Sequence, residues 1–403
     1  MRIAVFVAAG LVVFTGFLHA QADDDDEDDT DYFPLVPTGN SMRFGMRFVG
    51  GPKVAFHNVG GVPAILATPD LTVPGDHTYN DGYVNLDTRA DVNGHPYNNG
   101  QTSTWQVNYA SQITAAAEAT ATTPAVDSSV SYHVYSADSL GTTIKGRTST
   151  AAGWELQVGR SLGKIARKVN VSLIGGVTFS GINAKRSDQV QAQLTTVIDT
   201  YSLSGQDPPT APYTAPTQGT RNLYDGNGNP VLDANGVQKT TTVDTSILLA
   251  QNPTRVIKQT TDGTPNGPPT TTQVDGHWQI KGSYFTFRAG PVFQVPVTER
   301  LKLSLGFGAA VAFVGSTFKI DEEIVQDDVT APITYVDEKT RSVLLPAFYA
   351  DADAEYWLTE RTGLYLGATY QKSKSFEQTL ADHNATVDLG STSGIQSGFT
   401  LRF

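Results

Sequence analysis

The sequence contains no cysteine among its 403 residues. This absence excludes both a disulfide framework and a lipid anchor attached through an N-terminal cysteine. Tryptophan (4 residues) and methionine (3 residues) are scarce, and charged residues make up only 17% of the chain. Glycine (38), phenylalanine (18) and tyrosine (16) are far more frequent. This usage favours strands and turns over helices.

Long hydrophobic runs are also absent beyond the first 22 residues. No later stretch approaches the roughly 20 apolar residues that a membrane helix needs. The mean hydropathy of -0.22 is likewise too polar for a helical membrane protein. The net charge is -12. No basic patch offsets this acidity, so nucleic-acid binding is disfavoured.

Residues 1–22 read MRIAVFVAAGLVVFTGFLHAQA and have the three parts of a secretory signal peptide. Arg2 supplies the positive charge, residues 3–18 form an uncharged apolar core, and residues 20–22 offer a small-x-small cleavage site. We predict that residues 1–22 are removed. The alternative is an anchoring transmembrane helix, for which this apolar run is short.

Residues 23–40 begin with the acidic run DDDDEDDTD, which carries eight negative charges. A run of like charges repels itself and stays solvated, so we predict a disordered leader over residues 23–40. The alternative is divalent-cation binding at a membrane surface. The run lacks the turn geometry that a specific calcium site needs.

The rest of the chain is dominated by alternation of apolar and polar residues, the pattern of half-exposed strands. In residues 342–358, an unbroken apolar row from Leu344 to Leu358 alternates with a row that holds Asp351, Asp353 and Glu355. The longest apolar rows reach eight positions, which suits the 9–11 residues of a tilted membrane strand. The alternation predicts strands near 41–50, 149–161, 167–181, 277–294, 301–319, 342–358, 361–376 and 391–403.

Short polar turns alternate with long connections along these strands. The short turns lie at residues 160–168, 296–300 and 359–361, and the long connections span about 51–148, 182–276, 320–341 and 377–390. Short turns at one end and long loops at the other are typical of transmembrane β-barrels. We therefore predict an all-β, antiparallel, up-and-down transmembrane barrel of eight strands over residues 41–403. Ten strands are the alternative, if residues 104–113 and 128–136 form an extra membrane hairpin.

The chain ends in GIQSGFTLRF, with Ile395, Phe399, Leu401 and Phe403 on one side of the predicted strand. Together with the signal peptide, this ending resembles the assembly signal of bacterial outer-membrane β-barrel proteins. The resemblance implies the outer membrane of a Gram-negative-type bacterium, with both termini in the periplasm. It also implies contact with outer-membrane lipid, and with the barrel-assembly machinery during insertion. We expect a charge at Phe399 to impair insertion, and Thr400 on the opposite face to tolerate a polar change.

The opposite row of each predicted strand faces the barrel interior and carries charge. The interior of an eight-stranded barrel is just filled by side chains, and buried charges must be paired. The favoured interpretation is an ion-pair network that plugs and rigidifies the barrel, and the alternative is a narrow porin-like channel for ions or small polar solutes. The predicted network comprises Arg43, Arg47, Glu155, Arg288, Asp351, Asp353, Glu355, Arg361 and Arg402.

Two further patterns concern the long connections and the strand ends. Residues 205–222 and 261–273 are rich in Pro, Thr and Gly, so we expect them to be mobile and to form no core. Asp225, Asn227 and Asn229 have calcium-loop spacing, but Pro230 and Gly236 stand where such a loop needs Gly and Glu. The DG and NG dipeptides here predict hairpin turns instead.

The candidates for interfacial aromatic belts are Trp154, Trp278, Tyr356, Trp357 and Tyr370.

Catalytic motifs are missing from the sequence. No Gly-x-Ser-x-Gly elbow or His-Glu-x-x-His pair occurs, and Asp275 near His277 is the single pair that merits naming. We expect no enzyme, no catalytic residue, no cofactor and no metal. The predicted role is structural or one of surface interaction, carried by the long extracellular loops, with an unknown surface ligand. The channel is the runner-up, and a hydrolase sited at the barrel rim is a distant third.

Overall fold

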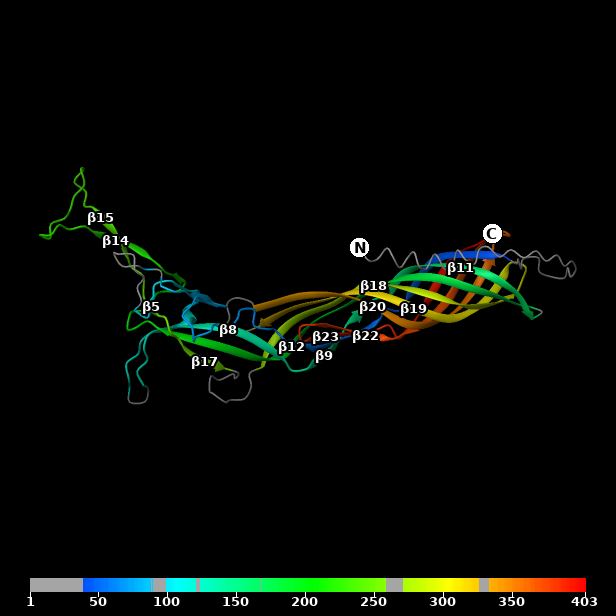
Figure 1. Ribbon diagram of the computed structural model, residues 1–403, viewed down its shortest axis with the longest axis horizontal. Coiled ribbons are helices and arrows are strands. Elements are labelled where there is room, and N and C mark those ends of the chain that lie inside the picture. Colours follow the sequence, from blue (N-terminus) through cyan, green and yellow to red (C-terminus); the bar gives the residue numbers. More distant parts are fainter. Residues whose placement is uncertain are drawn as a thin grey trace.

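The computed structural model describes residues 39–87, 89, 99–120, 124–166, 168–258, 271–325 and 333–403. The predicted signal peptide, and all but the last two residues of the predicted leader, lie outside this range. The described chain is almost entirely β-structure, with one short 3-10 helix, η1 (Ala110–Gln112). No helix in the described part is long and apolar enough to cross a membrane. The molecule is elongated and has three successive regions, which we call the ring, the waist and the head (Figure 1).

The ring is a closed cycle of antiparallel strands. Each strand pairs with two neighbours in the order β1–β24–β21–β20–β19–β18–β12–β11 and back to β1. The first strand therefore closes the ring with the last, because Phe44 lies opposite both Phe399 and Leu156. The all-β antiparallel prediction is confirmed. The eight strands are β1 (Asn40–Val49), β11 (Ala151–Ala166), β12 (Val169–Ser202), β18 (Thr271–Pro296), β19 (Leu301–Val325), β20 (Ile333–Trp357), β21 (Thr362–Ser373) and β24 (Ser391–Arg402).

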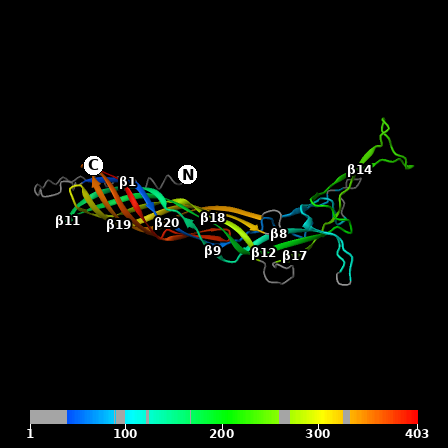
Figure 2. The same ribbon diagram turned by 180° about the vertical axis from the view of Figure 1, so that it is seen from behind.

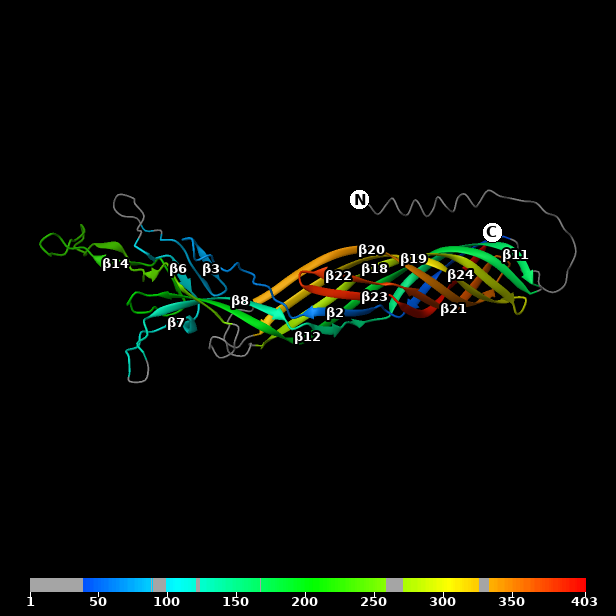
Figure 3. The ribbon, with the colours of Figure 1, turned by 60° about the horizontal axis from the view of Figure 1, so that its bottom comes forward.

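The waist begins where the eight strands of the ring separate into two sheets. β12, β18, β19 and β20 run on without interruption, whereas the other four ring strands break and continue as a separate sheet (Figure 3). That sheet has the order β22–β23–β2–β9, which repeats the order β21–β24–β1–β11 of the ring. Its strands are β22 (Ser375–Leu380), β23 (His383–Asp388), β2 (Lys53–Val59) and β9 (Thr142–Lys145), and the short β10 (Arg147–Thr148) pairs with β12.

The two sheets of the waist pack against each other through apolar side chains. Phe56 of β2 stacks on Phe318 of β19 with ring centroids 5.8 Å apart. Ile320, Trp278 and Val387 belong to the same buried cluster. The interior of the waist is therefore an apolar core rather than a water-filled extension of the ring.

The long strands reverse their amphipathic pattern between the ring and the waist. On β19, Leu303 and Phe307 point outward and are exposed, while Lys302 and Ser304 point inward and are buried. Farther along the same strand, the inward positions become apolar and the outward positions become polar. Phe318, Ile320 and Ile324 are buried there, and Thr317, Lys319, Asp321 and Glu323 lie on the other face.

This reversal explains why the predicted long loops are wrong in part. β12 continues to Ser202, β18 already begins at Thr271, and β19 ends at Val325. Among the described residues expected to be loops, 182–202, 271–276, 320–325, 333–341, 377–380 and 383–388 are thus strand residues. In the waist, the residues that point outward are polar. The outward apolar row that marks a membrane strand therefore ends before the strand itself ends.

The head lies at the far end of β12 and is built from the first and second long connections (Figures 1 and 2). Residues 104–113 and 128–136, the alternative membrane hairpin, lie here and outside the ring. Their β8 pairs with residues 192–202 of β12. The strands of the head are β3 (His77–Tyr79), β4 (Gly82–Val84), β5 (Gln101–Thr102), β6 (Trp105–Val107), β7 (Ile113–Thr114), β8 (Ser129–Ser139), β13 (Tyr213–Thr214), β14 (Gln218–Asn222), β15 (Thr240–Asp244), β16 (Leu249–Ala250) and β17 (Thr254–Lys258).

The head has its own core of aromatic residues. Tyr79, Tyr132 and Tyr201 contact one another, with Tyr79 and Tyr132 stacked at 5.0 Å. Tyr213 lies 4.7 Å from Trp105, and Ala215 is buried in the same cluster. The expectation that residues 205–222 form no core is therefore wrong for this part. Residues 261–270, the other Pro/Thr/Gly-rich stretch, lie outside the described residues.

The predicted hairpin turns after Asp225 are present. The Asp225 carboxylate accepts hydrogen bonds from the backbone N–H groups of Asn227 (2.9 Å) and Asn229 (2.8 Å). Gly228 has a φ of 81°, a left-handed conformation that glycine adopts without strain. The carboxylate that a calcium ion would need thus binds its own loop. Among the described residues, no group of three or more His, Cys, Asp or Glu side chains could hold a metal ion.

Candidate functional site: the ring interior and its mouth

Arg288 of β18 lies at the centre of the ring interior between two carboxylates. Its Nη2 is 2.7 Å from Glu155 Oε2 of β11, and its Nη1 is 2.5 Å from Asp351 Oδ2 of β20. All three side chains are almost fully buried. A buried guanidinium needs this pairing, because an isolated charge in such a place is very unfavourable. The ion pairs connect three strands across the ring.

A second set of ion pairs lies nearer the chain ends. Arg43 of β1 contacts Asp353 Oδ2 through Nη1 (3.1 Å) and Glu355 Oε1 through Nη2 (3.5 Å). Gln396 of β24 donates a hydrogen bond of 2.7 Å to the other Asp353 oxygen. The Tyr365 hydroxyl donates to Glu155 Oε1 at 2.6 Å, and the Arg43 guanidinium lies over the Tyr365 ring, 5.3 Å from its centroid. The two sets of ion pairs therefore meet at Tyr365.

Arg47 is linked to Asp351 through the hydroxyl group of Thr369. Its Nη2 donates to Thr369 Oγ1 at 3.0 Å, and Thr369 in turn donates to Asp351 Oδ1 at 2.7 Å. Beyond this layer, Gln371 donates to Thr286 Oγ1 at 3.2 Å. The polar interior therefore extends to the level at which the apolar waist core begins.

Gly367 provides the space that Asp353 occupies. A Cβ atom at this position would lie 1.9 Å from Asp353 Oδ1 and 2.7 Å from the Ala352 carbonyl oxygen. Any side chain on β21 at this point would displace the carboxylate from Arg43 and Gln396. A glycine inside a strand, otherwise unfavourable, is here a requirement of the charge network.

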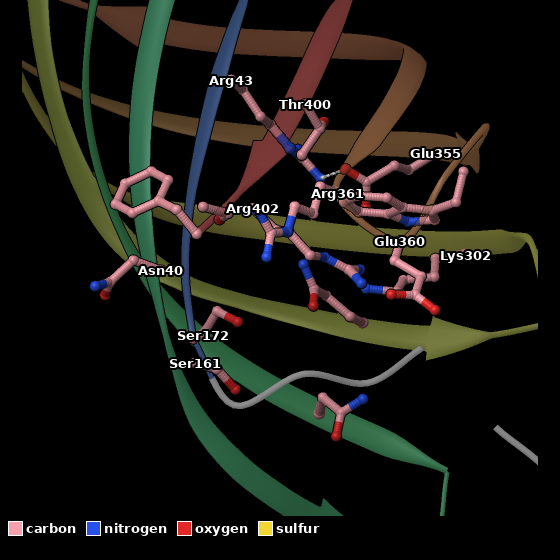
Figure 4. A pocket seen from close by; sticks show the side chains of 16 residues that line it. Asn40, Arg43, Ser161, Ser172, Lys302, Glu355, Glu360, Arg361, Thr400 and Arg402 are labelled. Carbon is pink, nitrogen blue, oxygen red and sulfur yellow. Dashed lines mark ion pairs between the residues drawn. The ribbon is translucent and has the colours of Figure 1, made fainter. Parts of the chain in front are cut away.

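A polar cavity of about 610 Å³ opens at the mouth of the ring beside Asn40 and Phe403 (Figure 4). Arg402 lies over the Trp357 ring at 3.3 Å from its centroid, and Lys302 Nζ lies 5.2 Å from the same centroid. Arg361 differs from its predicted place, because its side chain is exposed in the turn after β20 and lines the mouth. Turn residues project beyond the strand pleat, so the alternation that predicted it does not apply there.

The outer surface of the ring carries the opposite set of side chains. Ile395, Phe399, Leu401 and Phe403 are exposed (58%, 59%, 40% and 70%), whereas Gln396 and Thr400 are buried. Of the aromatic-belt candidates, Trp154, Tyr356 and Tyr370 lie on the outer surface. Trp278 and Trp357 are buried inside the waist and the mouth, so the belt prediction is wrong for both.

One buried carboxylate in the waist was not predicted. Glu322 accepts hydrogen bonds from Trp278 Nε1 (2.6 Å) and the Gly60 backbone N–H (2.8 Å), and its Oε2 lies 3.0 Å from His383 Nε2. The three partners come from three separated segments, so no local motif could reveal them. The contacts of Glu322 with Gly60 and His383 link β19 to the opposite sheet of the waist.

The Asp275 and His277 side chains engage different partners on the outer face of the waist. His277 Nδ1 lies 2.7 Å from Ser187 Oγ of β12, and Asp275 Oδ1 accepts a 2.8 Å hydrogen bond from Gln189. The Ser187–His277 contact spans two strands 90 positions apart and was invisible to sequence spacing. Both pairs are exposed.

No family model and no curated protein matches this chain. Among solved structures, it is similar to the outer membrane protease OmpT from Escherichia coli, at 8% identity and a TM-score of 0.27, over 93% of this chain and 100% of that one. It is also similar to Ail, the attachment invasion locus protein of Yersinia pestis, at 9% identity and a TM-score of 0.22, over 91% and 100% of the two chains. Similarities this low assign neither a family nor an activity.

Proposed function

We propose that this protein is an outer-membrane β-barrel protein in which the ring spans the lipid and the waist carries the head beyond the surface. The observation that supports this most directly is the reversal of burial along β18 and β19. Apolar outward faces suit lipid, and polar outward faces over an apolar core suit water. Both chain ends and the short turns would then lie on the periplasmic side. The proposed role is structural or one of surface interaction, borne by the head, and needs no catalysis.

The interior of the ring favours this role over a channel. Paired arginines and carboxylates occupy the middle of the ring, and the apolar waist core lies above them. The mouth cavity would then be a closed vestibule. A porin-like channel would need an open polar path along the whole ring.

Single cysteines can test the proposed orientation, because the chain has no cysteine of its own. Thr242→Cys lies in the exposed hairpin of the head, and Glu299→Cys lies in the turn between β18 and β19. On intact cells, a membrane-impermeant maleimide should label Thr242→Cys and should reach Glu299→Cys after the outer membrane is permeabilised. Labelling of Glu299→Cys alone would overturn the orientation, and recovery of the protein in the soluble periplasmic fraction would overturn the barrel.

Conductance separates the two roles of the interior. The refolded protein should leave a planar bilayer closed, and Asp353→Ala should lower the heat resistance of the folded barrel because Arg43 and Gln396 lose their partner. Discrete single-channel currents from the native protein, altered by Asp353→Ala, would instead establish the channel.

A further inference from the structure

The cavity at the mouth of the ring is lined by more cationic than anionic side chains. Two of its charged residues, Arg43 and Glu355, pair with each other. The remaining charged side chains give the cavity a net positive charge, although the chain as a whole has a net charge of -12. They are Lys302 of β19, Arg361 of the turn after β20, Arg402 of β24 and the acidic Glu360 (Figure 4).

Lys302 is buried at this cavity without a counter-ion. It is only 6% exposed, and no ion pair or hydrogen bond joins its ammonium group to another described residue. The ammonium lies 5.2 Å from the centroid of the Trp357 ring, which also carries Arg402 at 3.3 Å. A buried charge is unfavourable unless it is paired. Unlike Trp357 Nε1, the Lys302 ammonium is not sealed from solvent, so an anion in the cavity can reach it.

The turns around the mouth carry further positive charge. Lys164 at the end of β11 and Lys168 in the turn before β12 are both exposed. The turn between β18 and β19 exposes Arg300 together with the acidic Glu299. The described part of this end of the ring is therefore cationic on an acidic protein. Such a surface attracts anions and raises their local concentration.

The most acidic segment of the chain is attached directly at this mouth. Gly39 and Asn40 line the cavity, where the Ser161 N–H donates to the Gly39 carbonyl oxygen (3.1 Å) and the Asn40 N–H donates to that of Phe403 (3.3 Å). The acidic run, residues 23–31 with eight carboxylates, ends eight positions before Gly39. Eight residues span at most about 29 Å. The run is therefore held close to the cationic mouth.

We propose that the mouth cavity is a docking site for the acidic run of the same chain, whose carboxylates bind Lys302, Arg361 and Arg402. The run itself lies outside the described residues. The unpaired ammonium of Lys302, the cationic surroundings and the attachment at Gly39 all point to this occupant. A short covalent link gives an effective concentration of the order of millimolar, so several weak ion pairs are enough for docking. The docking needs the ring but no particular orientation in a membrane.

Two spin labels can measure the docking, because the chain has no cysteine of its own. Thr30→Cys places one label in the acidic run, and Val297→Cys places the other at an exposed position of the turn between β18 and β19. With the full chain in lipid nanodiscs, pulsed electron paramagnetic resonance should give a shorter and narrower distance distribution at 0.1 M salt than at 1 M. The Debye length falls from about 10 Å to about 3 Å between these concentrations. A broad distribution that is identical at both concentrations would overturn the proposal.

Charge variants test which side chains hold the acidic run. Arg361→Gln removes one exposed cation from the mouth, and Lys281→Gln removes the same charge from the exposed face of the waist. At 0.1 M salt, Arg361→Gln should broaden the distribution and Lys281→Gln should leave it unchanged. Lys302→Met should broaden it further, because this cation has no other counter-ion. Arg361→Gln changes an exposed side chain and keeps the test independent of folding. Equal distributions in Arg361→Gln and Lys281→Gln would contradict the site.

A peptide titration separates the acidic run from other anions. In a full-length variant whose eight acids in residues 23–31 are replaced by Asn and Gln, the peptide DDDDEDDTD should bind saturably. Adding Arg361→Gln should weaken its binding by up to about fivefold, the range for one exposed ion pair. Saturable binding of inorganic phosphate at the same ionic strength, without binding of the peptide, would assign the mouth to a small oxyanion and overturn the proposal.

Failure of the docking and failure of the membrane proposal are distinguishable outcomes. The cysteine labelling pattern reports on the orientation of the ring, whereas the distance between the spin labels reports on the mouth alone. An acidic run that does not dock would leave the membrane proposal intact.

Discussion

The ring and the waist share four long strands and yet are opposite in construction. In the ring, apolar side chains cover the outside and ion pairs fill the inside. In the waist, Phe318 and Ile320 fill the inside, and Thr317 and Lys319 cover the outside. The strands pass from one arrangement to the other with no break in hydrogen bonding along β19 and β20. The change therefore resides entirely in the side chains.

The contrast shows that the surroundings decide how each interior is stabilised. Burial of apolar surface stabilises the waist because the alternative is water, at roughly 25 cal/mol per Å². The same burial gives the ring little advantage if the alternative is lipid, so packing and hydrogen bonds between its strands must hold it together. Arg288 with its two carboxylates is the clearest instance of such an arrangement.

The largest effect is expected from a variant that removes Arg288 from between its two carboxylates. Arg288→Met leaves Glu155 and Asp351 buried without their cation, and removing one partner of a buried ion pair costs about 3–5 kcal/mol. The free energy of unfolding, measured by denaturant titration in lipid vesicles, should fall by about that amount. Arg186→Met is the matched control, because Arg186 pairs with Asp188 on the exposed face of the waist. An exposed pair contributes about 0–1 kcal/mol, so equal losses in the two variants would contradict the contrast.

A smaller effect is expected when a charge is placed on the outer face of the ring or of the waist. Phe307 of the ring and Val336 of the waist are both exposed, at 47% and 57%. If the ring spans lipid as proposed, Phe307→Arg places a charge against lipid, which costs about 2–4 kcal/mol near the bilayer midplane. Val336→Arg places the same charge in water, where surface substitutions change stability by about 0.5 kcal/mol or less. Folding yield and unfolding free energy in vesicles provide the measurement. Similar tolerance at both positions would show that the ring does not face lipid.

The ring was largely predictable from the sequence because its alternation is strict and its turns are short. The inward rows that contain Asp351, Asp353 and Glu355 follow directly from parity, and the structure places all three in the interior. The alternation along a strand shows which face of the sheet a residue lies on, but it does not show which residue its side chain contacts. It could not show that Arg47 reaches Asp351 through Thr369, because that depends on the stagger between strands.

The waist and head were harder to predict for a different physical reason. In the waist, polar residues lie outside as in any soluble sheet, so a search for apolar outward rows stops too early. In the head, His77, Asp199 and Arg255 come together from segments more than 50 positions apart. Short strands such as β3 and β4 carry too few residues to display a period.

The smallest expected effect concerns His77, a buried imidazole of the head whose Nδ1 lies 2.8 Å from the Tyr201 hydroxyl oxygen. Burial lowers the pKa of His77, the Asp199 and Asp76 carboxylates oppose this, and Arg255 reinforces it. A depressed pKa means that the folded head binds the proton less readily than the unfolded chain does. The stability that His77 contributes is thus complete above the ordinary histidine pKa of about 6.5. It is lost as the pH falls through the lower, folded value.

Amide hydrogen exchange of β3, corrected for the intrinsic rate at each pH, measures this opening of the head. Exchange should accelerate between pH 7 and pH 5 in the native protein. In His77→Gln, which keeps a polar side chain without a titrating group, the acceleration should disappear. Amides of β19 in the ring supply the internal reference and should show no matching change. If β3 exchange is equally pH-independent in both proteins, then His77 does not titrate in the head between pH 7 and pH 5, and its burial does not couple the stability of the head to pH.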